Sequence, residues 1–239
     1  MRIALIGYGK MGQMIEGIAL ERGHEIVLKI NIENTEDFNK ENIAKAEVAI
    51  EFTGPDSAYE DVKKCIEFGI PVVSGSTGWN DKLDKMKKYA KEKNGSFLHA
   101  SNFSIGVNIF FEVNKLLARL MSQQPSYNVS LKEIHHTQKL DAPSGTAVTL
   151  AEQVLQQITG KKKWVNNETN NKTELSIISE RIDPAPGTHE VKYSSEIDDI
   201  EIIHTAHNRK GFALGAVLAA EYIWNKKGVY TMKDVLNLG

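Results

Sequence analysis

The sequence predicts an α/β protein in which a doubly wound parallel sheet is combined with an α+β part that carries a mixed sheet. Over residues 2–100, short apolar runs alternate with helical patterns, which is typical of parallel strands joined by helices. After residue 102 this alternation stops, and three strand patterns follow one another over residues 174–207. A last helical pattern, rich in small apolar residues, is typical of a helix that packs back onto a sheet.

Five strands are expected in the first part of the chain. RIALI, residues 2–6, stops at Gly7, and apolar residues at helical spacing begin at Met11, so the order there is strand, turn, helix. The other expected elements are strands at residues 24–30, 48–52, 71–75 and 96–100, and helices at 57–68 and 81–93. The second of these helices is rich in lysine, and we interpret its charges as a solvated face.

The second part of the chain has a different order of elements. The expected elements are helices at residues 104–122 and 144–159, and strands at 127–134, 174–182, 188–196 and 199–207. Because short links join the last three strands, we expect them to be antiparallel neighbours. The polar residues 161–174 are expected to form an exposed loop in which Trp164 is a local packing anchor. An amphipathic helix that starts near Phe212 is expected to end the chain.

Composition and charge indicate a small-molecule partner. Hydrophobic residues make up 41% of the chain and charged residues 25%, so neither disorder nor a membrane span is indicated. The formal net charge of −2 gives no overall attraction for nucleic acid. Cys65 has no second cysteine to pair with, and the first apolar run is too short for a signal peptide, so a cytoplasmic location is expected.

GYGKMG, residues 7–12, matches G-x-G-x-x-G between a predicted strand and a predicted helix. In this context Gly7 permits the tight turn, Gly9 lets the backbone approach a pyrophosphate, and Gly12 allows close packing of helix on strand. The other cofactor-binding residues expected in this loop are Lys10 and Met11. The motif predicts a Rossmann-type dinucleotide-binding sheet, and a structural turn without ligand is the alternative.

The sequence leaves the choice between NADH and NADPH open. An acid at the end of the second strand normally binds the ribose hydroxyls of NAD and repels the 2′-phosphate of NADP. That position is Asn31 here, and Lys10 and Lys29 add positive charge nearby, so NADPH is acceptable. Glu33, two residues further on, could still favour NADH.

Three further loops follow predicted strand ends, where an open parallel sheet binds its ligands. GPDS follows VAIEF, GSTGW at residues 75–79 follows PVV, and ASNFSIG at residues 100–106 follows SFLH. Loops rich in glycine and hydroxyl groups at successive strand ends suit a nicotinamide ring and its carboxamide. Ordinary turn chemistry explains each loop singly.

EIHHTQKLDAPSGTA, residues 133–147, combines acid–base groups with a predicted helix start. Pro143 suits the first turn of a helix. Ser144, Gly145 and Thr146 then offer backbone N–H groups and hydroxyls to a carboxylate or phosphate. An anion-binding site is therefore expected at this helix start.

The residues just before this helix start indicate proton transfer. Lys139 adds a positive charge, and His135 and His136 exchange protons near neutral pH. Neighbouring residues of a strand face opposite ways, so His136 serves the same pocket only if the strand ends here, and a structural role for it stays open. The ligand spacings H-x-x-x-H and C-x-x-C are absent, so no metal is expected.

Together these motifs resemble the dihydrodipicolinate (4-hydroxy-tetrahydrodipicolinate) reductase family over essentially the whole chain. The resemblance rests on GYGKMG, on GSTGW, on ASNFSIGVN at residues 100–108, and above all on residues 133–147. These last residues resemble the family signature E-x-H-H-x-x-K-x-D-x-P-S-G-T-A at each defined position. The resemblance implies NAD(P)H-dependent reduction of a small dicarboxylate ring in diaminopimelate and lysine biosynthesis.

The resemblance also implies roles for individual residues. His135 resembles the catalytic acid, Lys139 the proton donor or its electrostatic support, and His136 a substrate contact. Gly145 and Thr146 match positions that hold a substrate carboxylate. The positions that match nicotinamide contacts are Gly75, Thr77, Gly78, Asn102 and Phe103.

A split architecture follows from the same resemblance. Residues 1–104 and 210–239 would form the dinucleotide-binding domain, and residues 105–209 a domain that binds substrate and assembles a homotetramer. Two departures are visible: GSTG replaces G-T-T-G, and RIDPAPGTH at residues 181–189 replaces R-x-G-x-x-G-x-H with altered spacing. The second departure is expected to change loops or subunit contacts.

Two other functions remain open at this point. Another amino-acid dehydrogenase of similar layout, such as an aspartate dehydrogenase, would have no reason for H-H-x-x-K ahead of P-S-G-T-A. A non-catalytic redox sensor would bind the dinucleotide without consuming it. Turnover of NAD(P)H with the pathway intermediate separates the sensor from the reductase.

Overall fold

The computed structural model describes residues 1–238, which divide into two compact units. Unit 1 comprises residues 1–105 together with the chain from Lys210 onward, and unit 2 comprises residues 106–209. The elements of unit 1 are β1 (Arg2–Ile6), α1 (Lys10–Glu21), β2 (Glu25–Ile30), η1 (Thr35–Asp37), α2 (Lys40–Ile43), β3 (Val48–Glu51), α3 (Ala58–Glu67), β4 (Val72–Ser74), η2 (Asn80–Lys82), α4 (Leu83–Glu92), β5 (Ser96–His99), α7 (Lys210–Ile223), β11 (Gly228–Tyr230) and α8 (Met232–Leu236).

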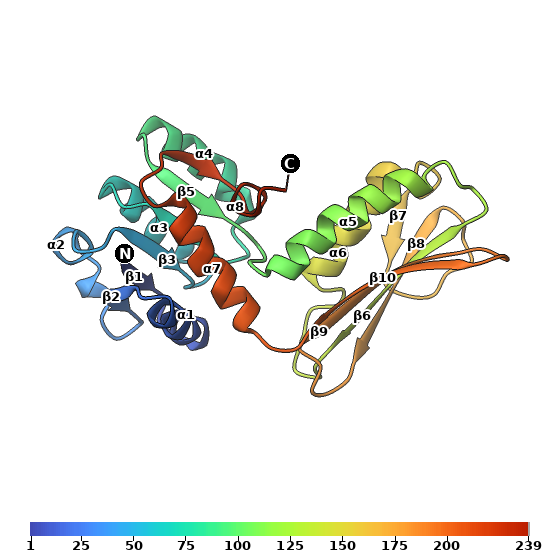
Figure 1. Cartoon of the computed structure of the whole chain (residues 1–239), viewed down its shortest axis with the longest axis horizontal. Helices are drawn as coiled ribbons and strands as arrows, with labels where there is room; N and C mark the ends of the chain where they lie inside the picture. The colour runs from blue at the N-terminus through green and yellow to red at the C-terminus, as the bar shows by residue number, and fades with distance from the viewer. Residues whose placement is uncertain (239) are drawn as a thin grey trace. The chain divides into compact units, whose positions relative to one another are not determined.

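Unit 1 is a parallel sheet of six strands in the order β11-β5-β4-β3-β1-β2, with helices on both faces (Figure 1). Side chains of β1 alternate between the two faces. Ile3 and Leu5 pack with α1 and α7, whereas Ala4 and Ile6 pack in the core that α3 and α4 cover. The predicted doubly wound sheet is therefore confirmed.

The order in which strands are added to this sheet reverses at β1. β2 lies on one side of β1, and β3, β4 and β5 follow one another on the other side. Such a switch point opens a crevice at the carboxyl ends of the strands, where open α/β sheets bind ligands. The loop after β1 and the loop after β3 approach closely there, because a Cβ on Gly7 would lie 2.3 Å from the Phe52 carbonyl oxygen. Gly7 has φ +97, so both space and backbone conformation require glycine.

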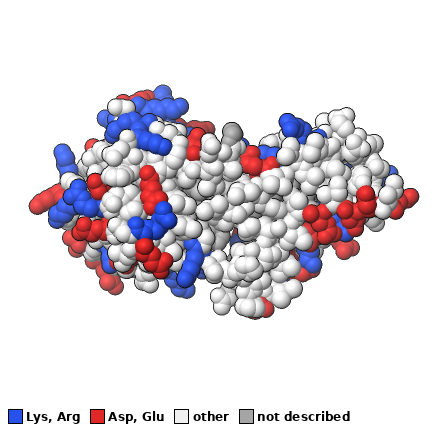
Figure 2. Space-filling view, viewed as in Figure 1, with Lys and Arg blue, Asp and Glu red and all other residues white. Residues whose placement is uncertain are grey.

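The lysine-rich helix is solvated, as the sequence predicts. Met86 and Ala90 form the buried side of α4, and Figure 2 shows Lys and Arg side chains gathered at the surface over this helix. Its ion pairs, such as Lys87 with Asp84 at 3.0 Å, stay within the exposed face. These charges therefore do not mark a binding site.

Unit 2 is a mixed sheet of five strands covered on one face by two helices (Figure 1). Its elements are α5 (Ile105–Met121), β6 (Asn128–His135), α6 (Gly145–Gln157), β7 (Lys163–Val165), β8 (Glu174–Arg181), β9 (Gly187–Ser194) and β10 (Asp199–Ala206). The strand order is β10-β9-β6-β8-β7. Val129 and Leu131 of β6 pack under α5 and α6, so the alternation of the strand carries Glu133 and His135 to the same covered face.

Two expectations about unit 2 and one about the C-terminal segment of unit 1 are wrong. β8 is not the antiparallel neighbour of β9, because β6 lies between them and pairs parallel with β8. Residues 161–174 include the edge strand β7, which forms because Trp164 packs on the core and its backbone pairs with β8. The chain does not end with α7, since β11 adds a sixth strand to the first sheet and α8 follows it.

Among residues 1–238, no helix combines the length and the apolar character that crossing a membrane requires.

Candidate active site

The glycine loop of unit 1 has the geometry that a dinucleotide requires. A Cβ on Gly12 would lie 2.5 Å from the Gly7 carbonyl oxygen, so glycine allows α1 to start tight against β1. Nothing lies within 4 Å of the position of a Cβ on Gly9, so the backbone there is open to a pyrophosphate. Lys10 is exposed and Met11 half-buried at the start of α1. These residues fit the phosphate part of NAD(P)H.

Asn31 at the end of β2 takes part in a turn of its own. Its side chain accepts a hydrogen bond from Glu33 N at 2.7 Å, and its backbone N–H donates to Asn34 Oδ1 at 2.8 Å. Lys29 is not free to meet a phosphate, because its Nζ lies 2.6 Å from the Glu16 carboxylate. The end of β2 therefore carries a neutral side chain at Asn31, and Lys10 is the exposed cation of the glycine loop.

A buried glutamate that the sequence analysis missed organises the loops after β3 and β4. Glu51 is fully buried and accepts hydrogen bonds from Thr53 N and Thr53 Oγ1, both at 2.6 Å, and from Ser74 Oγ at 2.5 Å. Ser76 Oγ donates to the same carboxylate. The signal was the single acid in VAIEF, an otherwise apolar strand. Glu51 thus ties together two loops expected to contact nicotinamide.

The predicted nicotinamide-contact residues lie in these loops. Gly75 is required because a Cβ there would meet the Phe52 ring at 2.1 Å, and Gly78 has φ +86. Thr77 is exposed between them. Asn102 Oδ1 accepts from Ser104 N at 2.9 Å. Phe103 as a whole residue is only 2% exposed and belongs to the core of unit 1, so the structure does not present it to a ligand.

In unit 2, Glu133 lies at the centre of a buried polar cluster. Its side chain is 0% exposed, and both of its carboxylate oxygens accept from Ser144 N, at 3.0 and 3.1 Å. Burial raises the pKa of Glu133, but hydrogen bonds from Ser144 and Ser179, together with the nearby His135, outweigh it and hold the pKa below its ordinary value. This ionised carboxylate connects the end of β6 to the start of α6.

A helix starts where the sequence predicts it, but Pro143 precedes the N-cap instead of lying in the first turn, and Ser144 N donates to Glu133. Ser144 is the N-cap of α6, and its Oγ accepts from Ala147 N at 3.2 Å. Gly145 and Thr146 lie in the first turn, the part of a helix whose N–H groups favour an anion. Around Gly145 there is open space, with nothing within 4 Å of a Cβ position. A carboxylate could therefore approach this backbone.

His135 lies beside Glu133 on the covered face of β6. Its Nδ1 is 3.5 Å from Glu133 Oε2 and has no hydrogen-bond partner among the described residues. Burial lowers the pKa of His135, the Glu133 charge opposes this, and Lys139 reinforces it. The imidazole is therefore neutral near pH 7 in the absence of an anionic ligand.

His189 of β9 completes the cluster and was not recognised as a site residue from the sequence. Its ring lies 5.1 Å from that of His135, edge to face, and its Nε2 is 3.1 Å from Ser144 Oγ. Burial, assisted by the neighbouring His135, lowers the pKa of His189 to about 3. The only sequence signal was that His189 matches the final histidine of R-x-G-x-x-G-x-H, the family pattern that residues 181–189 replace with altered spacing.

A pH effect on stability follows from His189. As the pH falls below its ordinary pKa of 6.5, the unfolded chain takes up a proton that the folded His189, with a pKa of about 3, refuses. Its contribution lowers the free energy of unfolding between pH 6.5 and 3, with a slope of up to about 1.4 kcal/mol per pH unit. Urea unfolding at pH 7, 6, 5 and 4 should show a shallower decline for His189→Gln, and equal slopes in both proteins would contradict the assignment.

The loop between β6 and α6 carries Lys139 and is held by Arg181. Arg181 donates to the Lys139 carbonyl at 3.2 Å, to the Asp141 carbonyl at 2.6 Å and to Glu133 Oε1 at 3.3 Å. Lys139 Nζ contacts the Asp141 carboxylate at 2.7 and 2.9 Å. The bond Ala142–Pro143 in this loop is cis. Lys139 is thus paired with an exposed acid that a dianionic ligand can replace.

β6 ends at His135, so His136 lies beyond the strand and the alternation of side chains between the two faces of the sheet does not apply to it. It lies outside the Glu133 cluster and near Asp183, whose carboxylate accepts from Thr137 N at 3.1 Å and Thr137 Oγ1 at 2.6 Å. The structure thus brings together His135, Lys139 and the start of α6. His136 lies in the loop directly after β6 and outside this group.

Glu133, His135 and His189 offer three ligand atoms within 4.8 Å of one another, a spacing that a metal ion can use. The carboxylate is already engaged by Ser144 N, and the Arg181 guanidinium lies 3.3 Å from it. A cation placed between these side chains would meet that positive charge at short range. The cluster therefore suits acid–base groups better than a metal ion.

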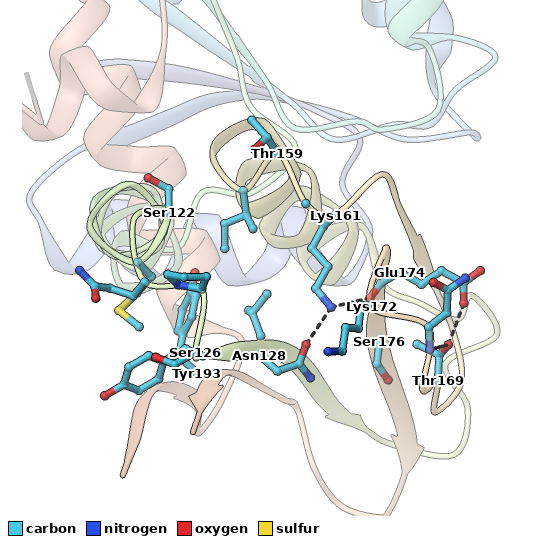
Figure 3. Close-up of a pocket in the computed structure, with 18 of the residues that line it drawn as sticks. Ser122, Ser126, Asn128, Thr159, Lys161, Thr169, Lys172, Glu174, Ser176 and Tyr193 are labelled. Atoms are coloured by element: carbon cyan, nitrogen blue, oxygen red, sulfur yellow. Dashed lines mark hydrogen bonds between the residues drawn. The ribbon is translucent and has the colours of Figure 1, made fainter. Parts of the chain in front are cut away.

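A pocket of about 570 Å³ lies at the opposite end of the same sheet (Figure 3). Lys161 on its wall donates to Asn128 Oδ1 and to the Glu174 carbonyl, both at 2.8 Å. Asn128 begins β6 and His135 ends it, so the two lie about 23 Å apart along the strand. The residues described as lining this pocket include none of residues 133–147, so it is separate from the candidate active site.

A Rossmann-type sheet in unit 1 and a buried acid–histidine cluster in unit 2 define the class of NAD(P)H-dependent oxidoreductases. Two family models match the chain, "Dihydrodipicolinate reductase, N-terminus" over residues 1–103 and "Dihydrodipicolinate reductase, C-terminus" over residues 106–236. The chain therefore belongs to the dihydrodipicolinate reductase family, which confirms the resemblance seen in the sequence.

Individual relatives agree with this membership. A 4-hydroxy-tetrahydrodipicolinate reductase of Christiangramia forsetii is 51% identical over 239 residues, covering 99% of this chain and 98% of the relative. The enzyme of the same name from Neisseria gonorrhoeae is 31% identical, covering 93% of this chain and 84% of the relative.

A solved dipicolinate-bound dihydrodipicolinate reductase from a Paenisporosarcina species shares the fold. The TM-score is 0.79 at 23% identity, and the match covers 98% of both chains. An amine dehydrogenase from Mycobacterium smegmatis reaches a TM-score of 0.63 at 12% identity over 98% of this chain and 95% of that one. Both likenesses concern the fold.

Proposed function

We infer that the protein catalyses the NAD(P)H-dependent reduction of 4-hydroxy-tetrahydrodipicolinate to tetrahydrodipicolinate in diaminopimelate and lysine biosynthesis. The observation that carries this inference is the family match over both units, with 51% identity to a reductase of that activity. Either NADH or NADPH serves as cofactor, since the glycine loop fits the dinucleotide and the end of β2 carries no acid at Asn31.

The proposed site is built for a doubly negative ring. Gly145 and Thr146 would bind one carboxylate at the start of α6, and Lys139 would exchange its Asp141 partner for the substrate. Loss of the 4-hydroxyl group as water would leave a ring carbon conjugated to an imine, and NAD(P)H, when bound, supplies a hydride to that carbon. His135, supported by Lys139, would donate the accompanying proton on the ring-nitrogen side, where negative charge develops. His136 would add a further polar contact to the substrate.

Because burial lowers the pKa of His135, its imidazole is neutral before the substrate binds. A neutral His135 must gain a proton before it can act as an acid, and a dianion bound beside it favours the charged imidazolium. Glu133 at 3.5 Å supports the same charge from the buried side. Substrate and proton are therefore expected to bind together.

The test of the proposed function is a coupled assay with dihydrodipicolinate synthase. NAD(P)H should be oxidised only when the synthase product is present, and both cofactors should be compared side by side. An aspartate dehydrogenase would instead oxidise NAD(P)H with oxaloacetate and ammonia. A redox sensor would bind the dinucleotide without oxidising it, and that result would remove the reductase from consideration.

Asn31→Asp is expected to shift the cofactor preference toward NADH. The carboxylate keeps the hydrogen bond from Glu33 N and adds a negative charge that repels the 2′-phosphate of NADPH. We expect the ratio of kcat/KM for NADH over NADPH to rise about tenfold, which corresponds to about 1.4 kcal/mol. Steady-state kinetics of wild type and Asn31→Asp with both cofactors checks this, and an unchanged ratio in Asn31→Asp contradicts it.

We also propose that the enzyme works in the cytoplasm as a homotetramer assembled through unit 2. The support is the face of the unit 2 sheet opposite α5 and α6, where Ile134, Ile178 and the 55% exposed Ile203 lie among polar side chains. A single buried cysteine, Cys65, suits a reducing compartment. Sedimentation velocity should give a tetramer, and Ile203→Lys should dissociate it; a monomeric wild type would exclude this assembly.

A further inference from the structure

The proposed chemistry uses His135, Lys139 and the start of α6, and beneath them lies a charged pair whose one role so far is the support that Glu133 gives to a charged His135. Glu133 is 0% exposed, and the Arg181 guanidinium lies 3.3 Å from its Oε1. A buried charge of this kind is retained only where its contacts compensate for its desolvation. The contacts of this pair reach the start of α6, the Lys139 loop and His135.

One side of Glu133 fixes the anion-binding helix start. Both carboxylate oxygens accept from Ser144 N, the N–H of the residue that caps α6. The strand that carries His135 is thereby tied at about 3 Å to the turn that carries Gly145. A shift of either element would break a charge-assisted hydrogen bond in the protein interior.

The other side of Glu133 fixes the Lys139 loop through Arg181. The guanidinium bridges the carboxylate and two backbone carbonyls, those of Lys139 at 3.2 Å and Asp141 at 2.6 Å. A lysine at position 181 would keep the positive charge but could not span three acceptors with a planar fork. The guanidinium therefore sets the position of the Lys139 backbone.

Glu133 also faces His135, whose Nδ1 lies 3.5 Å from Oε2 without a hydrogen-bond partner in residues 1–238. The other charged or titratable groups that act on His135 or its neighbour His189 are Lys139, Asp141, Arg181 and His204. Of these, Lys139 and Arg181 disfavour the imidazolium, and the exposed Asp141 favours it. Glu133 is the buried anion that supports the protonated acid.

We propose that Glu133 and Arg181 are positioning residues for the proposed reduction: Glu133 holds the proton donor His135 and the carboxylate-binding turn of α6 in register, and Arg181 extends that control to the Lys139 loop. This proposal rests on the proposed function. Glu133 is 0% exposed, and Arg181 donates to Glu133 and to backbone carbonyls of the Lys139 loop, so we assign to each a role through the groups it holds.

Glu133→Gln tests the charge. The amide keeps the size of the side chain, but it no longer supports the imidazolium of His135. We expect kcat to fall about 30-fold, and the limb of the pH profile where activity falls with rising pH should move about one unit lower. The KM for NAD(P)H should stay unchanged. Glu180→Gln on the other face of the sheet removes a half-exposed carboxylate as control.

Arg181→Lys tests the bridge. We expect the KM for the dicarboxylate to rise about tenfold and kcat to fall, while the pH profile stays in place because the positive charge is kept. Arg119→Lys on the exposed side of α5 is the matched control. Equal kinetics of Arg181→Lys and wild type would overturn the role of Arg181.

A measurement without turnover separates this proposal from the proposed function. The His135 ring can be titrated by NMR in the presence of dipicolinate as a non-reducible probe, for wild type, Glu133→Gln and Glu133→Asp. We expect a lower pKa in Glu133→Gln and partial recovery in Glu133→Asp. An unchanged His135 titration in a folded Glu133→Gln would overturn the proposal, whereas a wild type without reductase activity would overturn only the proposed function.

Discussion

Replacement of His135 or Lys139 by alanine should lower kcat by about two orders of magnitude or more, the usual contribution of a positioned proton donor. His135 is buried beside an ionised Glu133, so alanine removes the one imidazole of β6 whose charged form this carboxylate supports when the substrate is bound. Lys139 carries the ammonium closest in sequence to the anion-binding turn, and its alanine variant leaves that turn without its cation.

Unit 1 should be untouched by both replacements, because they lie in unit 2. Dissociation constants for NADH and NADPH, measured by fluorescence, should therefore match those of the wild type. His136→Ala provides the neighbouring comparison and should raise the KM for the dicarboxylate more than it lowers kcat. Turnover at the wild-type rate in both the His135 and Lys139 variants would refute the assigned roles.

Gly215→Ala should destabilise the protein by about 2 kcal/mol or more, although alanine is the better helix former. A Cβ at this position of α7 would lie 1.8 Å from the Phe103 carbonyl oxygen, which is backbone and cannot rotate away. The helix propensity gain of about 1 kcal/mol is therefore outweighed by the displacement of packed backbone. Since Phe103 follows Asn102 in a loop predicted to contact nicotinamide, dinucleotide affinity should fall as well.

Gly17→Ala in α1 is the matched control for this prediction. It is also a helical glycine, but nothing lies within 4 Å of its Cβ position. This replacement should raise the free energy of unfolding by about 0.5 to 1 kcal/mol. Urea unfolding of the two variants should thus give changes of opposite sign, and a stabilised Gly215→Ala would contradict the close approach of α7 to the Phe103 backbone.

Features that depend on neighbouring residues in sequence could be predicted. The glycine loop at residues 7–12 and the turn at residues 143–147 are each formed by one short segment, so spacing alone placed them at helix starts. The doubly wound sheet was readable for the same reason, because its first five strands alternate with helices along the chain.

The parts that could not be predicted depend on which strands pair. Glu133 stands opposite His189 and His135 opposite Arg181 because β6 lies between β9 and β8. Short links suggested that β8 and β9 were neighbours, and that pairing would have excluded the buried cluster. The sequence showed acid–base residue types but carried no local signal for the register that assembles them.

The split of unit 1 determines the order in which the two sheets can be completed during synthesis. Ile3, Leu5 and Leu98 are made early, yet α7, which packs in the same core, emerges from the ribosome only after all of unit 2. Until then, α1 covers this face of the nascent sheet without α7, so part of its apolar surface stays open while unit 2 is being made. We expect chaperones to protect this partly covered face of the nascent chain.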